Sequence, residues 1–221
     1  MSKDYANLSN FALRSEKKVN DGRNVLNVLS SYQREHEVFD TDRCLNEIRD
    51  GIAAGLIGFD RDNIDKNGFD CANSKGELLE VKSVNCSSSS WGATFNDTTE
   101  KKALSFKEDN VYLQVPLWVS AAEISCFLIG SNPEIGEFLL SKVKHYNENR
   151  EDIIRCTQSL PITKLYKEFG FKIVAVDYTK EKVVELLKKQ YPKAFRSICV
   201  DDIMSVEEYN EFKANKANNN N

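Results

Sequence analysis

The stretch NGFDCANSKGELLEVKSVN, residues 67–85, has the pattern of two short strands joined by a tight turn. Residues 67–73 and 77–84 are the predicted strands. The three residues between them, Ser74-Lys75-Gly76, place glycine where a hairpin loop needs a left-handed backbone. The sequence therefore predicts a β-hairpin, and we expect the rest of the chain to be built around it.

Three charged residues meet in this hairpin. The loop length pairs Asp70 with Glu80 across the two strands, where opposed side chains lie about 5 Å apart. Because strand residues alternate between faces, Lys82 shares the face of Glu80, with Val81 between them. Two carboxylates and one ammonium group are thus predicted to meet at one edge of a sheet. A solvated hairpin with incidental charges has the same pattern, since Asp, Glu and Lys are abundant in this chain.

Two opposed carboxylates repel each other unless a cation lies between them. Mg²⁺ is commonly held by one or two carboxylates together with water and substrate phosphates, so it would relieve this repulsion. Lys82 could then orient or deprotonate a water molecule, or meet the charge that develops on a phosphate. The pattern therefore favours metal-dependent chemistry on a phosphate group.

The spacing of Asp70, nine further residues and then Glu80-x-Lys82 resembles the motif of the PD-(D/E)xK nuclease superfamily, the fold of many type II restriction endonucleases. The apolar positions around Glu80 supply the buried second strand that this motif needs. Phe69 stands where the family name has proline, a departure that leaves the acidic residue in place. The specific resemblance covers roughly residues 41–130.

The resemblance implies a Mg²⁺-dependent endonuclease that hydrolyses phosphodiesters in double-stranded DNA and leaves 5′-phosphate ends. It implies metal ligands at Asp70, Glu80, the backbone carbonyl of Val81 and a helical glutamate, Glu47. Lys82 would complete the catalytic set by positioning the attacking hydroxide or by acting as its base. A sequence-specific enzyme of the restriction type is expected to be a homodimer, because two strands must be cut.

The helix that carries Glu47 is predicted from about residue 41 to residue 54, ahead of the hairpin. Its apolar stripe consists of Cys44, Leu45, Ile48, Ile52 and Ala53. Glu47 lies beside this stripe, where it could face the hairpin site. A glutamate on the solvated surface of the helix is the alternative interpretation.

A serine-rich segment follows the hairpin. Ser87, Ser88, Ser89 and Ser90 cannot form core, so the segment is predicted to be a mobile loop. Because the loop leaves the strand near the expected metal site, its hydroxyl groups and Trp91 are candidates for DNA contacts. A flexible connector is the alternative.

The length, net charge and cysteine spacing of the chain limit the kinds of protein that it can be. With 221 residues and 41% hydrophobic content, the chain can form one sizeable α/β domain. A net charge of −4 argues against a non-specific coat for nucleic acids, but allows an acidic metal site beside a local basic groove. The six cysteines show no CxxC spacing, so neither zinc nor a disulfide framework is expected. No apolar run could span a membrane and the polar N-terminus is no signal peptide, which favours a cytoplasmic protein.

The predicted order of elements is helix, helix, strand-turn-strand, helix, strand, strand, helix, helix, strand, helix. This order predicts an α/β fold with a central mixed sheet and helices on both faces, which fits a restriction-endonuclease-like core. We expect a single domain over residues 1–210, with its core at about 41–130. The Asn-rich residues 211–221 are predicted to form a disordered tail.

Three alternatives stay open beside the restriction-type enzyme. A repair, recombination or homing nuclease of the same superfamily would use the same chemistry. A non-catalytic DNA-binding or interaction protein could have the fold without the activity, although the intact Asp-Glu-Lys set disfavours this. An unrelated α/β protein could contain a coincidental hairpin. The DNA sequence that would be recognised is not readable from the chain, because base readout uses only a few side chains.

Overall fold

The computed structural model describes residues 8–36, 43–60, 69–148 and 156–219. Its helices are α1 (Leu8–His36), α2 (Arg43–Gly55), α3 (Glu100–Ser105), α4 (Glu134–Glu148), α5 (Ile162–Lys167), α6 (Lys180–Gln190) and α7 (Val206–Asn219), with a 3₁₀ turn at Val200–Asp202. Its strands are β1 (Cys71–Ala72), β2 (Leu78–Val81), β3 (Val84–Asn85), β4 (Gly92–Thr98), β5 (Val111–Trp118), β6 (Ile124–Gly130), β7 (Cys156–Pro161), β8 (Lys172–Ala175) and β9 (Ile203–Met204). In this part of the chain no helix combines enough length with enough apolar character to span a lipid bilayer.

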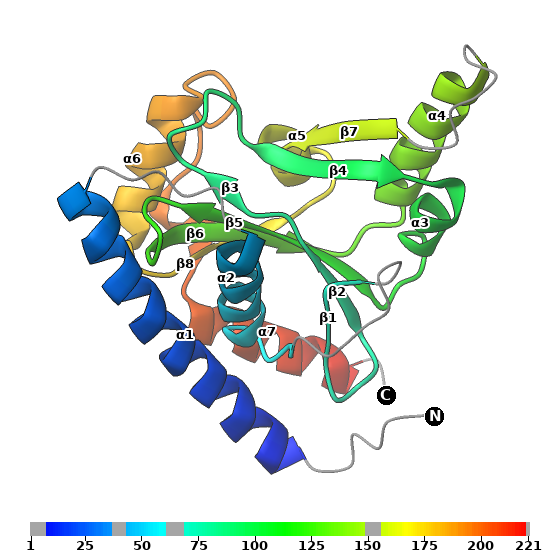
Figure 1. Cartoon of the computed structure of the whole chain (residues 1–221). Helices are drawn as coiled ribbons and strands as arrows, with labels where there is room; N and C mark the ends of the chain where they lie inside the picture. The colour runs from blue at the N-terminus through cyan, green and yellow to red at the C-terminus, as the bar shows by residue number, and fades with distance from the viewer. Residues whose placement is uncertain (1–7, 37–42, 61–68, 149–155, 220–221) are drawn as a thin grey trace.

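The main sheet is mixed, as the sequence predicts (Figure 1). Its strand order is β1-β2-β5-β6-β8-β9, and β3 pairs with β5 beyond the end of β2. β2 runs parallel to β5 and β8 parallel to β9, whereas the β1–β2, β5–β6 and β6–β8 pairs are antiparallel. The short β1 therefore ends the sheet on the side of the predicted hairpin.

Helices cover both faces of this sheet, which confirms the α/β architecture (Figure 1). Phe127 and Val174 point to one face, where they pack in a hydrophobic cluster with residues of α1, α2 and α7. Their neighbours Leu128 and Ile173 point to the other face, into a cluster with residues of α3, α4, α5 and α6. The separate two-stranded sheet of β4 and β7 packs into this second cluster.

The hairpin has the predicted register. Cys71 pairs with Leu79 and Ala72 with Leu78, so the same register continued by one residue sets Asp70 opposite Glu80. Gly76 has a φ of +76°, the left-handed conformation expected of the loop glycine. The strands are shorter than predicted because side chains replace part of the ladder: Asn73 Oδ1 accepts the N–H groups of Lys75 and Glu77 inside the loop.

β2 and β3 are separated by a break at Lys82-Ser83, and the sequence of β5 explains it. Gln114 O accepts the N–H of Lys82, and Trp118 O accepts the N–H of Cys86. Every second residue of β5 directs its backbone N–H and C=O toward β2 and β3, so Pro116, between Gln114 and Trp118, faces the same way. Pro116 has no N–H to donate. The break therefore lies where the neighbouring strand lacks a donor, and it places Lys82 at the end of β2.

Several parts of the predicted layout differ from the structure. The strands β4, β7 and β9 were not predicted, although Trp91, just before β4, alternates with Ala93 and Phe95 of β4 as buried residues with more exposed neighbours. At the other end of the chain, α7 continues to Asn219, so the predicted disordered tail from residue 211 is helical over its described part. Contact with the hairpin stabilises this helix, because Lys213 of α7 forms an ion pair with Glu77.

Candidate functional site

The structure gathers four charged residues at the end of β2. Glu80 is buried, and its two carboxylate oxygens bind different lysines: Lys82 Nζ lies 2.6 Å from Oε1, and Lys102 Nζ lies 2.7 Å from Oε2. Asp70 Oδ2 accepts the backbone N–H of Val81 at 2.8 Å. We call Asp70, Glu80, Lys82 and Lys102 the Glu80 cluster; three of its members are the residues that the sequence singled out.

Lys102 was not among the predicted site residues. It lies in the first turn of α3, whose N-cap Thr99 accepts the N–H of Lys102 on its side-chain oxygen. The position of α3 depends on close packing against α4, because a Cβ on Gly136 would lie 2.8 Å from the carbonyl oxygen of Ala103. No local sequence pattern predicts that Lys102 binds Glu80, since only tertiary packing brings α3 to β2.

Aromatic rings form the wall behind the two ammonium groups. Lys102 Nζ lies 4.1 Å from the ring centroid of Phe69, and Lys82 Nζ lies 5.6 Å from that of Phe95. Phe106 contacts both rings edge-on, at 5.4 and 5.5 Å between centroids. A ring face attracts a cation, so these three phenylalanines stabilise the charged lysines where little water reaches them.

The electrostatics of the cluster favour an ammonium on Lys82. Burial by itself lowers the pKa of Lys82, but Glu80 and Asp70 outweigh it, and the pKa is raised. The pKa of Asp70 is also raised, first by burial and then by the negative charge of Glu80, against the lysines and the Val81 N–H, which lower it. Asp70 is therefore a carboxylate whose charge the site does not fully compensate.

Among the described side chains of α2, Asp50 is an acidic residue that lies near the cluster. Its Oδ1 accepts a hydrogen bond from Ser83 Oγ at 2.8 Å, and its charge contributes to the raised pKa of Lys82. Trp118 Nε1 donates to the same Ser83 hydroxyl at 3.2 Å. The side chain of the predicted Glu47 lies outside the described residues. Asp50 is three residues further on, a spacing that places it on the same side of the helix, and this spacing was the signal available in the sequence.

Two carboxylates of the cluster are oxygen donors of the kind that a hard divalent cation prefers, and both oxygens of Glu80 bind lysines in this structure. Asp70 and Glu80 supply carboxylate oxygens, and the N–H and C=O of Val81 point to the same side of the strand, so its carbonyl opens toward Asp70. The raised pKa of Asp70 marks the negative charge that such an ion would neutralise. Within residues 8–36, 43–60, 69–148 and 156–219, no group of three or more His, Cys, Asp or Glu side chains could hold a metal ion. Water or substrate oxygens would have to complete the coordination.

The serine segment divides into an exposed loop and a core residue. The side chains of Ser87 to Ser90 are exposed, while Gln190 of α6 donates to the carbonyl oxygens of Ser88 and Ser89 and holds the loop in place. Trp91 is buried: its ring meets Tyr191 edge-on at 5.9 Å, and its Nε1 donates to Ser88 O. The expectation that Trp91 contacts DNA is therefore wrong, because its apolar ring is used in the core.

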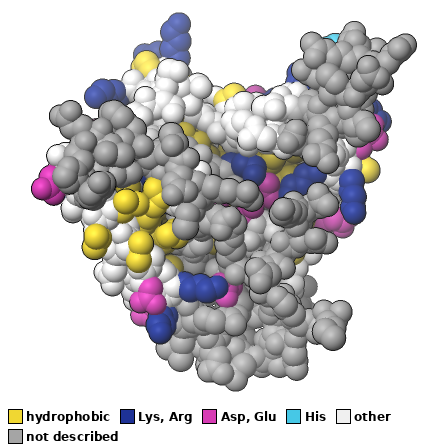
Figure 2. Space-filling model, viewed as in Figure 1, with side chains coloured by type: hydrophobic (Ala, Val, Ile, Leu, Met, Phe, Trp, Pro, Cys, Tyr) yellow, Lys and Arg dark blue, Asp and Glu magenta, His cyan; other side chains and the backbone are white. Residues whose placement is uncertain are grey.

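Charged side chains of both signs lie next to one another at the middle of the face shown in Figure 2. No protein-family model matches this chain, and no curated protein matches it.

Proposed function

We propose that the chain is a Mg²⁺-dependent endonuclease that hydrolyses phosphodiester bonds in double-stranded DNA, with a restriction-endonuclease-like core. One observation carries the proposal: Asp70, Glu80 and Lys82 converge at the end of one strand, in the register that the hairpin predicts. Two partly desolvated carboxylates beside an ammonium are suited to bind a divalent cation and a phosphate together.

In this mechanism Asp70, Glu80 and the carbonyl of Val81 would hold Mg²⁺, which would polarise the phosphate and lower the pKa of a bound water. Lys82 lies against Glu80, where it would orient the attacking water or act as its base. Lys102 supplies a second positive charge toward the charge that develops on the phosphate. Hydrolysis then leaves a 5′-phosphate and a 3′-hydroxyl.

The finer parts of the proposal follow from the resemblance to restriction enzymes. A sequence-specific enzyme in the cytoplasm would act as a homodimer, with each copy cutting one strand. The exposed hydroxyls of Ser87 to Ser90 would contact the DNA backbone. A repair, recombination or homing nuclease would use the same cluster on a different target.

A second candidate function rests on the charge balance of the cluster. Both oxygens of Glu80 are paired with lysines, so two carboxylates and two ammonium groups balance without any metal. A network of this kind can stabilise a fold without chemistry. The chain would then be a non-catalytic DNA-binding or interaction protein.

Cleavage of a long, sequence-diverse DNA with and without Mg²⁺ separates these functions. The wild type is compared with Lys82→Ala and with Lys188→Ala, an exposed lysine of α6 that serves as a matched control. Discrete fragments from the wild type and the control, but not from Lys82→Ala, are expected of a site-specific endonuclease. A smear indicates a repair or structure-directed enzyme. No cleavage, together with no Mg²⁺ binding in calorimetry, overturns the nuclease proposal in favour of the second candidate.

A further inference from the structure

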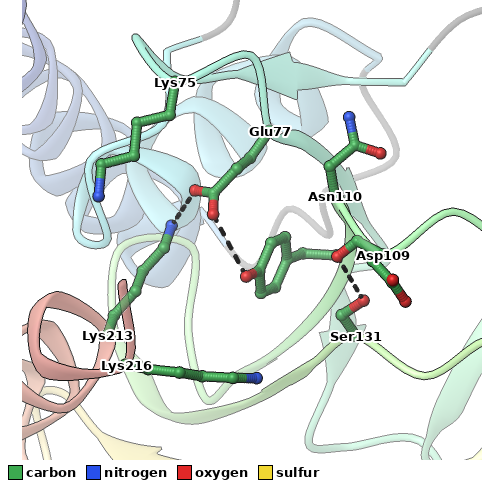
Figure 3. A pocket seen from close by; sticks show the side chains of 8 residues that line it. Lys75, Glu77, Asp109, Asn110, Ser131, Lys213 and Lys216 are labelled. Atoms are coloured by element: carbon green, nitrogen blue, oxygen red, sulfur yellow. Dashed lines mark hydrogen bonds and ion pairs between the residues drawn. The ribbon is translucent and has the colours of Figure 1, made fainter. Parts of the chain in front are cut away.

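A pocket of about 470 Å³ lies between the tip of the hairpin and α7. Figure 3 shows that its lining divides into two sides. Lys75, Lys213 and Lys216 gather on one side, and Asp109, Asn110 and Ser131 lie on the other. The pocket is distinct from the Glu80 cluster, because Glu77 and Glu80 are three residues apart and an odd spacing along a strand reverses the face.

The inner wall of the pocket is built around Glu77. Lys213 Nζ binds Glu77 Oε2 at 2.8 Å, and Tyr112 donates its hydroxyl to Oε1 at 3.3 Å. The same Lys213 ammonium lies 4.2 Å from the ring centroid of Phe59 and 5.0 Å from that of Tyr112. This wall holds its shape without a ligand, since each polar group of the Glu77–Lys213–Tyr112 set has a partner.

Positive charge is in excess in this pocket. Neither Lys75 nor Lys216 forms an ion pair with any residue that the structure describes, and both side chains are exposed. Burial lowers the pKa of Lys213, and the nearby charge of Lys75 lowers it further, against the pairing with Glu77. Three lysines thus stand against the carboxylates of Glu77 and Asp109, which leaves an unmatched positive charge.

We infer that the pocket binds a phosphorylated sugar or nucleoside, with the phosphate against the lysines and the sugar hydroxyls toward Asp109 and Asn110. Lysine is a common binder of phosphate, which it contacts as a point charge. The volume is within the range of about 300–1,000 Å³ of small-molecule sites, larger than a bare phosphate needs. The carboxylate of Asp109 and the amide of Asn110 offer acceptors for hydroxyl groups on the side away from the lysines.

Isothermal calorimetry on the full chain without Mg²⁺ tests the inference. The probes are adenosine 5′-monophosphate, ribose 5-phosphate, adenosine and inorganic phosphate. We expect the two phosphorylated sugars to bind more tightly than phosphate, adenosine not to bind, and the affinity to fall with salt. The double variant Lys75→Ala/Lys216→Ala should weaken binding by about ten-fold or more, whereas Lys188→Ala/Lys189→Ala on α6 should not.

Other outcomes overturn the inference. Binding of none of the probes does so, as does an equal loss in the α6 control. Binding that Lys82→Ala abolishes and Lys75→Ala/Lys216→Ala leaves unchanged assigns the ligand to the Glu80 cluster instead. Circular dichroism of each variant verifies folding. A 5′-phosphorylated oligonucleotide used as a fifth probe separates the two sources of the same chemistry: tighter binding than the mononucleotide identifies a nucleic-acid end, and weaker binding a free metabolite.

Discussion

Glu77 and Glu80 lie three residues apart at β2, and each is bound by lysine, yet their surroundings differ. Glu80 is buried, and each of its two oxygens binds a lysine whose ammonium group lies against a phenylalanine ring. Glu77 lines an open pocket in which lysines are in excess. The two lysines respond in opposite directions: the pKa of Lys82 is raised, and that of Lys213 is lowered.

This difference shows that an ion pair has no fixed role. A buried carboxylate between two ammonium groups is costly to remove, because both cations are then left without a counter-charge. A partly buried pair beside two exposed lysines that form no ion pair with any described residue tolerates change better, and it has positive charge available for a ligand. The Glu80 cluster is therefore expected to be sensitive in stability, and the Glu77 pocket sensitive in binding.

The largest predicted difference between the two regions is the loss of stability when each glutamate is replaced by glutamine. Glu80→Gln should lower the free energy of unfolding by about 3–5 kcal/mol, because it leaves Lys82 and Lys102 partly buried without a counter-ion. Glu77→Gln should cost only about 1 kcal/mol, because Glu77 is less buried than Glu80 and pairs with one lysine instead of two, and the amide can still accept hydrogen bonds. Urea denaturation of both variants at neutral pH measures the difference. Equal losses would mean that enclosure does not distinguish the two regions.

A methyl group added at the contact between α3 and α4 should disturb the Glu80 cluster and leave the Glu77 pocket unchanged. Gly136→Ala brings a methyl group to about 2.8 Å from the Ala103 carbonyl, so α3 and its Lys102 must shift. We expect a loss of about 1–3 kcal/mol in urea denaturation, the usual cost of overpacking. Nucleotide binding at the Glu77 pocket should not change.

The control for this variant is Gly51→Ala in α2, where an added Cβ meets no atom within 4 Å. Alanine favours a helix over glycine by about 1 kcal/mol, so this substitution should be neutral or stabilising. A loss as large as that of Gly136→Ala would show that helix geometry, and not the α3–α4 contact, is the cause.

The hairpin register was predictable because it depends on local chemistry. Gly76 fixes the loop, and the loop length alone sets Asp70 opposite Glu80. The apolar strands β5 and β6 and the mixed α/β sheet follow from runs of buried residues in the same way.

The rest of the candidate site depends on contacts between distant parts of the chain. Lys102 reaches Glu80 only because α3 packs on α4, and Lys213 reaches Glu77 only because α7 folds back on the hairpin. Trp91 was mistaken for a surface residue because serines precede it, although its own alternation with Ala93 indicates a strand. Asp50 reaches Ser83 and the surroundings of Lys82 only because α2 packs against the end of β2.

Asp70→Asn tests the uncompensated charge in the Glu80 cluster. Folding raises the pKa of Asp70 above 3.8, so the folded state binds its proton more tightly and wild-type stability falls as pH rises through the folded pKa. Asparagine can still accept the Val81 N–H, so the variant should be more stable at neutral pH, by on the order of 1 kcal/mol. This gain should shrink as the pH is lowered toward 3.8. Lower stability of the variant at neutral pH would instead mean that the lysines already compensate Asp70.

The smallest effect separates the two lysines by their pH dependence. Folding lowers the pKa of Lys213 below 10.5, so the cost of its buried charge is fully present below the folded pKa and is relieved as pH rises. Wild-type stability relative to Lys213→Met should therefore increase by a few tenths of a kcal/mol between about pH 8 and about pH 10. The pKa of Lys82 is raised above 10.5, so wild type relative to Lys82→Met should stay level over the same range and fall only above it.

Urea denaturation of the three proteins at each pH gives both difference curves, from which the titration of the tyrosines largely cancels. If the stability difference from wild type depended on pH in the same way for both methionine variants, Lys82 and Lys213 would not differ in their electrostatic surroundings. Opposite curvature would tie it to their charge balance: two carboxylates hold Lys82 charged, while Lys213 shares one carboxylate with the nearby charge of Lys75. In that case the excess charge beside Lys213, and not the ion pair itself, is what prepares the Glu77 pocket for an anion.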